Sequence, residues 1–155
     1  MTINQVPDWA AIKPVKINDA PHIDQHGNVC LPTSGGTLTI SLYADAIRLR
    51  IGKTRPSEQY GILVSVPHQE APAISSEDDR TTISAGPLTG VIEHDPFSFE
   101  FYKGDRLVQR SSTDGHFERR FRLPPLAKVA EGWMINLDLE SNEPVYGLGE
   151  KWGKL

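Results

Sequence analysis

The chain has 155 residues, a length typical of one domain that buries enough apolar surface to fold without disulfides or metals. Its 38% hydrophobic and 23% charged residues are ordinary for a globular protein and argue against disorder. A formal net charge of −4 provides no basic field for a phosphate backbone, so we expect no nucleic-acid partner.

Three features of the sequence indicate where in the cell the protein is expected. No apolar run approaches the length of a membrane span, and we expect no membrane partner. Cys30 is the only cysteine, so an internal disulfide is impossible. The first residues lack the basic and apolar regions of a secretory signal. The default expectation is a soluble protein of the cytoplasm.

The first third of the chain predicts an arm followed by short strands. Residues 1–21 contain three prolines and no sustained period, and we interpret them as an N-terminal arm. Residues 22–31 are typical of a hairpin, with Gly27 and Asn28 at its turn. Residues 32–36 are predicted to form the next turn.

Alternating apolar and polar residues then predict strands. Residues 37–43 and 47–51 alternate in this way and are expected to be half-buried strands, and residues 61–66 form a third. Residues 68–80 are rich in proline and acidic side chains, without a period, and are predicted to be a surface loop.

The strongest element of the sequence is a hairpin near its middle. Residues 81–84 and 90–93 are candidate strands that precede it. Residues 97–102 alternate three phenylalanines with polar side chains, turn at Lys-Gly-Asp, and return as residues 106–110. Two-residue periodicity of this kind is typical of an antiparallel strand pair with one buried face.

The last third continues the same pattern. Residues 117–123 alternate and predict a strand, and only residues 126–131 have the character of a helical turn. Residues 133–139 place Trp133 in phase with the apolar side chains that follow, so we expect Trp133 to pack in the core. Many short strands with little or no helix predict an all-β fold, an antiparallel β-sandwich or barrel.

A specific resemblance is carried by the end of the chain, whose residues 143–150 read EPVYGLGE. This run is similar to the signature that closes the N-terminal β-sandwich of glycoside hydrolase family 31, the α-glucosidases and α-xylosidases. Residues 96–102, PFSFEFY, and the Lys-Gly-Asp turn after them also resemble that domain. The resemblance covers roughly residues 38–155.

The resemblance implies a galactose-mutarotase-like sandwich that is normally followed by a (β/α)8 barrel. In that family two aspartates of the barrel act as nucleophile and general acid/base in a retaining mechanism. Neither the barrel nor the pair is in this sequence. We therefore expect residues 22–155 to be a sandwich domain truncated before the barrel and inactive alone. Its partners would be its own catalytic barrel and the carbohydrate substrate, with no cofactor.

The candidate site residues are two residues of the signature, Tyr146 and Glu150, and Trp152 just after it. Trp152 follows the last strand in a glycine-flanked segment, and we expect it near a substrate or a domain interface. Glu150 is expected to orient that segment, and Tyr146 to lie in the core or at the sheet edge. We assign no catalytic residue and no metal ligand.

Other polar groups are interpreted as surface or structural. The acidic run at residues 77–79 is expected to be a solvated cluster, since adjacent residues of a loop do not hold two carboxyls across a sugar ring. His22 and His26 have the spacing of a metal pair on a helix but lie in a predicted hairpin. His94 and Asp95 are adjacent, so in a strand they point to opposite faces.

Two alternatives to the packing domain stay open. The first is a stand-alone carbohydrate-binding module, which requires a row of exposed aromatic rings or a polar groove. Aromatic residues make up only 8% of the chain, and most are in phase with core positions. The second is a mutarotase-like enzyme in its own right, which usually needs a longer chain.

Overall fold

The computed structural model describes residues 12–44, 46–52, 70–112, 116–117, 121–129, 132–139 and 141. Within these ranges the chain forms β-strands and no helix. No helix in the described part is therefore long or apolar enough to cross a membrane.

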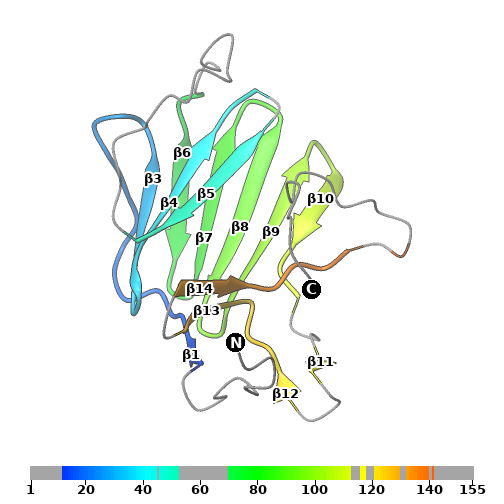
Figure 1. The fold of residues 1–155 in the computed structure, drawn as a ribbon. Coiled ribbons are helices and arrows are strands. Elements are labelled where there is room, and N and C mark those ends of the chain that lie inside the picture. The colour runs from blue at the N-terminus through cyan, green and yellow to red at the C-terminus, as the bar shows by residue number, and fades with distance from the viewer. Residues whose placement is uncertain are drawn as a thin grey trace, which may run out of the picture.

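The first layer is a four-stranded antiparallel sheet with the order β2-β3-β4-β5 (Figure 1). Its strands are β2 (His22–Ile23), β3 (Val29–Thr33), β4 (Gly36–Leu42) and β5 (Ile47–Ile51). The predicted hairpin is confirmed, because β2 and β3 pair around a turn in which Gly27 has a φ of 79°. The predicted strands of residues 37–43 and 47–51 are confirmed as β4 and β5.

The second layer is a five-stranded antiparallel sheet in which each strand pairs with the next along the chain (Figure 1). Its strands are β6 (Ala73–Glu77), β7 (Arg80–Ala85), β8 (Leu88–His94), β9 (Phe97–Lys103) and β10 (Arg106–Arg110). The hairpin at the middle of the sequence is confirmed as β9 and β10, with Gly104 at a φ of 57° in its turn.

A third, smaller sheet crosses one end of these layers (Figure 1). It consists of β1 (Lys13–Pro14), β13 (Leu126–Val129) and β14 (Gly132–Ile135), in the order β1-β13-β14. Val15 and Leu126 extend from it into the core, with exposed fractions of 2% and 4%. A separate pair consists of β11 (His116–Phe117) and β12 (Phe121–Arg122).

The core lies between the two large sheets, and the molecule is an antiparallel β-sandwich. Leu38, Ile40 and Leu42 of β4 point inward from one sheet, and the alternate residues of β7, β8 and β9 point inward from the other. The rings of Phe99 and Phe101 lie 5.0 Å apart in this cluster. The two-residue period of each strand thus brings its apolar side chains to one shared interior.

Trp133 also packs against this core, as its phase predicted. Its ring is seated beside Gly35, where a Cβ atom would lie 2.4 Å from the ring. Lys128, the residue opposite in the β13–β14 pair, places its ammonium 4.7 Å from the centre of the same ring. The small sheet is therefore attached to the sandwich through an aromatic side chain.

Two predictions from the sequence were wrong in the kind of element. The surface loop of residues 68–80 contains β6, which pairs with β7 along its whole length. The helical turn of residues 126–131 is instead β13, which pairs with both β1 and β14. In both cases the hydrogen bonds of a neighbouring strand decide the conformation, and a local pattern does not report that neighbour.

Three further predictions were wrong, two in the extent of an element and one in its burial. Residues 117–123 are not one strand, because β11 and β12 pair with each other in antiparallel fashion. The turn expected at residues 32–36 is shorter, since β3 runs to Thr33 and β4 begins at Gly36. β4 is buried on both faces rather than one, and its Ser41 hydroxyl donates to Asn28 at 2.5 Å.

Candidate functional site

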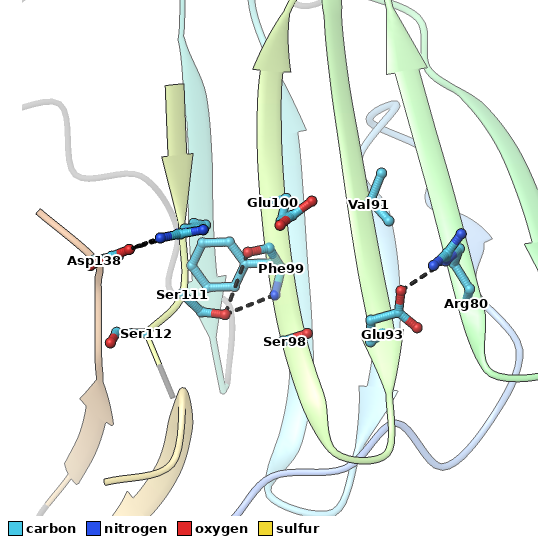
Figure 2. A pocket seen from close by; sticks show the side chains of 10 residues that line it. Arg80, Val91, Glu93, Ser98, Phe99, Glu100, Ser111, Ser112 and Asp138 are labelled. Atoms are coloured by element: carbon cyan, nitrogen blue, oxygen red, sulfur yellow. Dashed lines mark hydrogen bonds and ion pairs between the residues drawn. The ribbon is translucent and has the colours of Figure 1, made fainter. Parts of the chain in front are cut away.

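A polar pocket of about 570 Å³ lies on the face of the five-stranded sheet that points away from the core (Figure 2). Four strands contribute to it, together with the segments that follow β10 and β14. Its lining consists of Arg80, Val91, Glu93, Ser98, Phe99, Glu100, Arg110, Ser111, Ser112 and Asp138. We call this site the polar pocket.

One side of the polar pocket is an ion pair between neighbouring strands. Arg80 and Glu93 are directly opposite each other in the β7–β8 ladder. The Arg80 Nε donates to Glu93 Oε1 at 2.8 Å, and both side chains are partly exposed. The hydrogen bond and the charge of Glu93 raise the pKa of Arg80 above its ordinary value. The guanidinium is thus held as a fixed cation.

The other side brings together residues far apart in the sequence. Arg110, at the end of β10, forms an ion pair with Asp138, with 2.5 Å between its terminal nitrogen and Asp138 Oδ2. The segment after β14 is held beside β10 by backbone and side-chain bonds. The Asp138 amide donates to the Arg110 carbonyl, and the Gln109 side chain donates to the Asp138 carbonyl at 2.7 Å.

The floor of the polar pocket is the outward face of β8 and β9. Val91, Ser98 and Glu100 lie between the Arg80–Glu93 pair and Asp138 (Figure 2). The Tyr102 hydroxyl donates to Glu100 Oε2 at 2.5 Å. This bond, with desolvation and the charge of Glu100, raises the pKa of Tyr102. Glu100 is therefore fixed in place by a neutral tyrosine.

The polar groups of the pocket are held in fixed positions by hydrogen bonds. Each of its three carboxylates is held by a hydrogen bond, two from arginines and one from a tyrosine. Such groups present oriented acceptors and donors to a ligand. Among the described residues, no group of three or more His, Cys, Asp or Glu side chains is placed to hold a metal ion.

A second concavity, of about 300 Å³, lies where the two large sheets meet at one edge of the sandwich. We call it the apolar groove. Its lining consists of Ala46, Ile47, Leu49, Leu88, Phe99, Phe101, Lys103, Val108, Gln109, Ile135 and Leu137. Val108, Ile135 and Leu137 are 44%, 46% and 40% exposed. Leu137 is tied to the five-stranded sheet by a β-bridge to Ser111.

Exposed large hydrophobic side chains are concentrated on the two segments that form one side of this groove. Six large hydrophobic side chains are exposed in the described part of the chain, and five of them lie on β10 or on residues 135–139. The five are Leu107, Val108, Ile135, Leu137 and Leu139. The sixth, Ile23, is on β2 of the other sheet. The apolar side chains of residues 133–139 were expected to share one face, but β14 ends at Ile135, and Ile135, Leu137 and Leu139 are exposed.

The candidate residues Tyr146, Glu150 and Trp152 lie outside the described residues, so their roles stay predictions. The histidines and acidic residues considered in the sequence analysis lie within the described part of the chain. His22 is in β2 and His26 in the turn after it, and His26 contacts Gln25. Glu77 ends β6, and Asp78 and Asp79 form the turn to β7.

His94 and Asp95 point to different partners, as their adjacency predicted. The His94 ring contacts the Thr81 hydroxyl at 2.8 Å, whereas Asp95 forms an ion pair with Lys16 at 2.6 Å. His116 is part of β11. Neither His94 nor Asp95 lines the polar pocket.

Sequence reasoning missed the residues that make up the polar pocket. Glu93, Ser98 and Glu100 are the polar members of alternating strands, and that phase already marks them as outward-facing. The sequence offers no signal that Arg110 and Asp138 meet, because 28 residues separate them. Only the docking of the segment after β14 brings them together.

No curated protein matches the chain. Residues 37–155 match the model of the glycosyl hydrolase 31 N-terminal galactose mutarotase-like domain. That match covers most of the chain and includes both large sheets from β4 onward. The all-β sandwich and this match agree with the resemblance carried by residues 143–150. The chain belongs to the family of glycosyl hydrolase 31 N-terminal galactose mutarotase-like domains.

Proposed function

We propose that this domain is a non-catalytic part of a retaining α-glycosidase of the α-glucosidase or α-xylosidase type. In this proposal it packs on the catalytic barrel of the full-length protein and shapes the entrance for the carbohydrate substrate. The barrel would carry the two carboxyl groups that hydrolyse O-glycosyl bonds. Family membership supports the proposal, since the domain family takes its name from its place before a hydrolase.

One observation of the structure carries the packing role. Three of the six exposed large hydrophobic side chains in the described part of the chain, Val108, Ile135 and Leu137, line the apolar groove. Contiguous apolar exposure of this kind marks protein–protein contacts, whereas singly scattered apolar side chains do not. Core rings of Phe99 and Phe101 line the same groove, so a covering domain would extend the existing core.

The first test is to read the gene beyond the codon for Leu155. We expect an open frame that continues into a barrel with two aspartates at strand ends. A stop codon at that point would overturn the proposal. Purified protein consisting of the 155 residues should not hydrolyse aryl α-glucosides, and turnover that survives rigorous purification would contradict it.

The second test separates packing from folding. Val108→Asp and Leu137→Asp place a charge in the apolar groove, and Ile23→Asp places one at an equally exposed position of β2. In the 155-residue chain all three should change stability by less than about 1 kcal/mol, because the side chains are exposed. In the full-length enzyme only the two groove variants should lower the melting temperature and the activity. Equal effects of all three would argue against packing at the groove.

A carbohydrate-binding module is the second candidate function. One observation favours it, because the polar pocket supplies the polar groove that such a module requires. This candidate does not depend on the apolar groove.

A further inference from the structure

The polar pocket has a rigid base. On β8 and β9 the inward residues, such as Ile92 and Phe99, are 0% and 2% exposed, which fixes the strands that carry the outward ones. Glu93, Ser98 and Glu100 therefore project from two paired strands of one sheet. A binding site on such strands is positioned more accurately than one on loops, and it is present before a ligand arrives.

The edge of the pocket next to β10 is also held in place by hydrogen bonds. The Ser111 hydroxyl, 8% exposed, accepts from the Phe99 amide at 3.0 Å, at the residue that follows β10. The Ser112 amide donates to the carbonyl of Asn136. These bonds fix the segment that brings Asp138 to the pocket, so the Arg110–Asp138 ion pair keeps its place.

The charges of the pocket select the kind of ligand. Three carboxylates (Glu93, Glu100 and Asp138) face two guanidiniums (Arg80 and Arg110), so the lining has no positive excess to attract a phosphate or sulfate. Carboxylates accept hydrogen bonds and guanidiniums donate them. A ligand with hydrogen-bond donors and acceptors on neighbouring atoms can bond to both the carboxylates and the guanidiniums. Vicinal hydroxyl groups have this property.

We infer that the polar pocket binds a neutral polyhydroxylated ligand, of the class of short oligosaccharides. Its volume of about 570 Å³ falls within the range of roughly 300–1,000 Å³ typical of small-molecule sites. Ligand hydroxyls donate to Glu100 and Glu93 and accept from the arginines, while Val91 offers an apolar contact to the CH groups of the ring. This inference names the site for the second candidate function and does not require packing at the apolar groove.

The test is a titration of the 155-residue chain with maltose and xylotriose, followed by amide chemical shifts in NMR spectra. We expect saturable shifts that centre on Val91, Glu93, Ser98 and Glu100. Glucose 6-phosphate should bind more weakly than the neutral sugars. The absence of saturable shifts with either neutral sugar would overturn the inference, and so would shifts that centre outside the pocket.

Two pairs of variants locate the binding. Ser98→Trp fills the floor of the pocket and should abolish the shifts, whereas Ser75→Trp on exposed β6 of the same sheet should leave them intact. Glu100→Gln removes one charged acceptor and should raise the dissociation constant about tenfold. Glu77→Gln is its control and should leave the dissociation constant unchanged. The glutamine variant keeps the test decisive if the tryptophan variant fails to fold. Unchanged affinity in Glu100→Gln would contradict the inference.

These outcomes are independent of the packing proposal. The sugar titration uses the chain alone, whereas the packing test compares variants at the apolar groove in the full-length enzyme. Sugar binding without packing would favour the second candidate function, and packing without sugar binding would refute only the present inference.

Discussion

Gly90 shows how one residue limits the packing of the core. It lies in the middle of β8, opposite Phe101 of β9. A Cβ atom at this position would lie 2.8 Å from the Phe101 ring, which is itself 4% exposed and has little room to move. The glycine is therefore required by the close approach of an aromatic ring, not by an unusual backbone angle.

We expect Gly90→Ala to lower the free energy of unfolding by about 1–3 kcal/mol, the usual cost of overpacking a filled core. Gly132→Ala is the matched control, because no atom lies within 4 Å of its added Cβ. That control should change stability by no more than about 0.5 kcal/mol. Urea denaturation followed by circular dichroism measures both, and equal effects would show that the Phe101 ring moves aside.

Asp24 organises the turn between β2 and β3. Its carboxylate accepts from the amides of His26 and Asn28 at 2.8 and 2.9 Å and from the Asn28 side chain at 2.8 Å. Partial desolvation raises the pKa of Asp24, but these hydrogen bonds together outweigh it. The pKa therefore lies below its ordinary value.

A lowered pKa means that Asp24 stabilises the folded chain most when it is charged. Its contribution is complete above the unfolded pKa, about 3.9, and is lost as the pH falls through the lower folded value. Asp24→Ala should cost about 1 kcal/mol at pH 7, and its difference from the native chain should shrink below about pH 4. Asp24→Asn, which keeps one acceptor oxygen, should lose less. A difference independent of pH would contradict this account.

At the scale of elements, Ser111 continues the contact between β9 and the chain just after the end of β10. The β9–β10 ladder shifts between Leu107 and Gln109. Beyond the shift, the Ser111 amide donates to the Phe99 carbonyl at 2.9 Å, and its hydroxyl accepts from the Phe99 amide at 3.0 Å. A side chain thus replaces a backbone acceptor at a buried position.

Ser111→Ala should leave the Phe99 amide without its acceptor and cost about 1–3 kcal/mol, the usual effect of an unsatisfied buried polar group. Ser75→Ala on the exposed strand β6 is the control and should be close to neutral. Thermal unfolding measures the difference, and amide exchange at Phe99 reports the bond directly. Protection of that amide equal to the native chain would show that another group accepts from it.

Elements also show where a sequence pattern is sufficient. Phe97, Phe99 and Phe101 alternate with polar residues, so β9 could be predicted without knowledge of its partners. β6 has one apolar residue, Ile74, packed against the core, and its other side chains are mostly exposed. An edge strand of this kind has no local signature, because its pairing with β7 is what makes it a strand.

For the whole molecule, the two large sheets share one core. Ile40 of β4 is 0% exposed and belongs to the same cluster as Ile83 of β7 and Ile92 of β8. Neither sheet buries its apolar face without the other. We therefore expect both sheets to unfold together.

Ile40→Ala should lower the free energy of unfolding by about 2–5 kcal/mol, as is usual for a fully buried side chain. The loss should appear equally in hydrogen exchange of β4 and of β8. Ile23→Ala, at a residue 47% exposed, is the control and should cost no more than about 0.5 kcal/mol. Faster exchange confined to the four-stranded sheet would show that the sheets unfold separately.

The sequence by itself determined the class of fold and the family. Alternation with a period of two is a local property of each strand, and it marks inward residues such as Ile40 and Phe99 wherever the partner lies. The signature at residues 143–150 pointed to the same domain family that the match to residues 37–155 shows. Trp133 packs against the core, as its phase predicted, although the in-phase side chains of Ile135 and Leu137 are exposed.

The existence of the polar pocket and the apolar groove could be seen only in the tertiary structure. The polar pocket needs Arg110 and Asp138 on adjacent segments, and the apolar groove needs β5 of one sheet beside β10 of the other. These contacts join residues that are distant along the chain, and their formation depends on how whole sheets pack. A local pattern indicates which face of a strand is apolar, but it does not indicate which other element packs against that face.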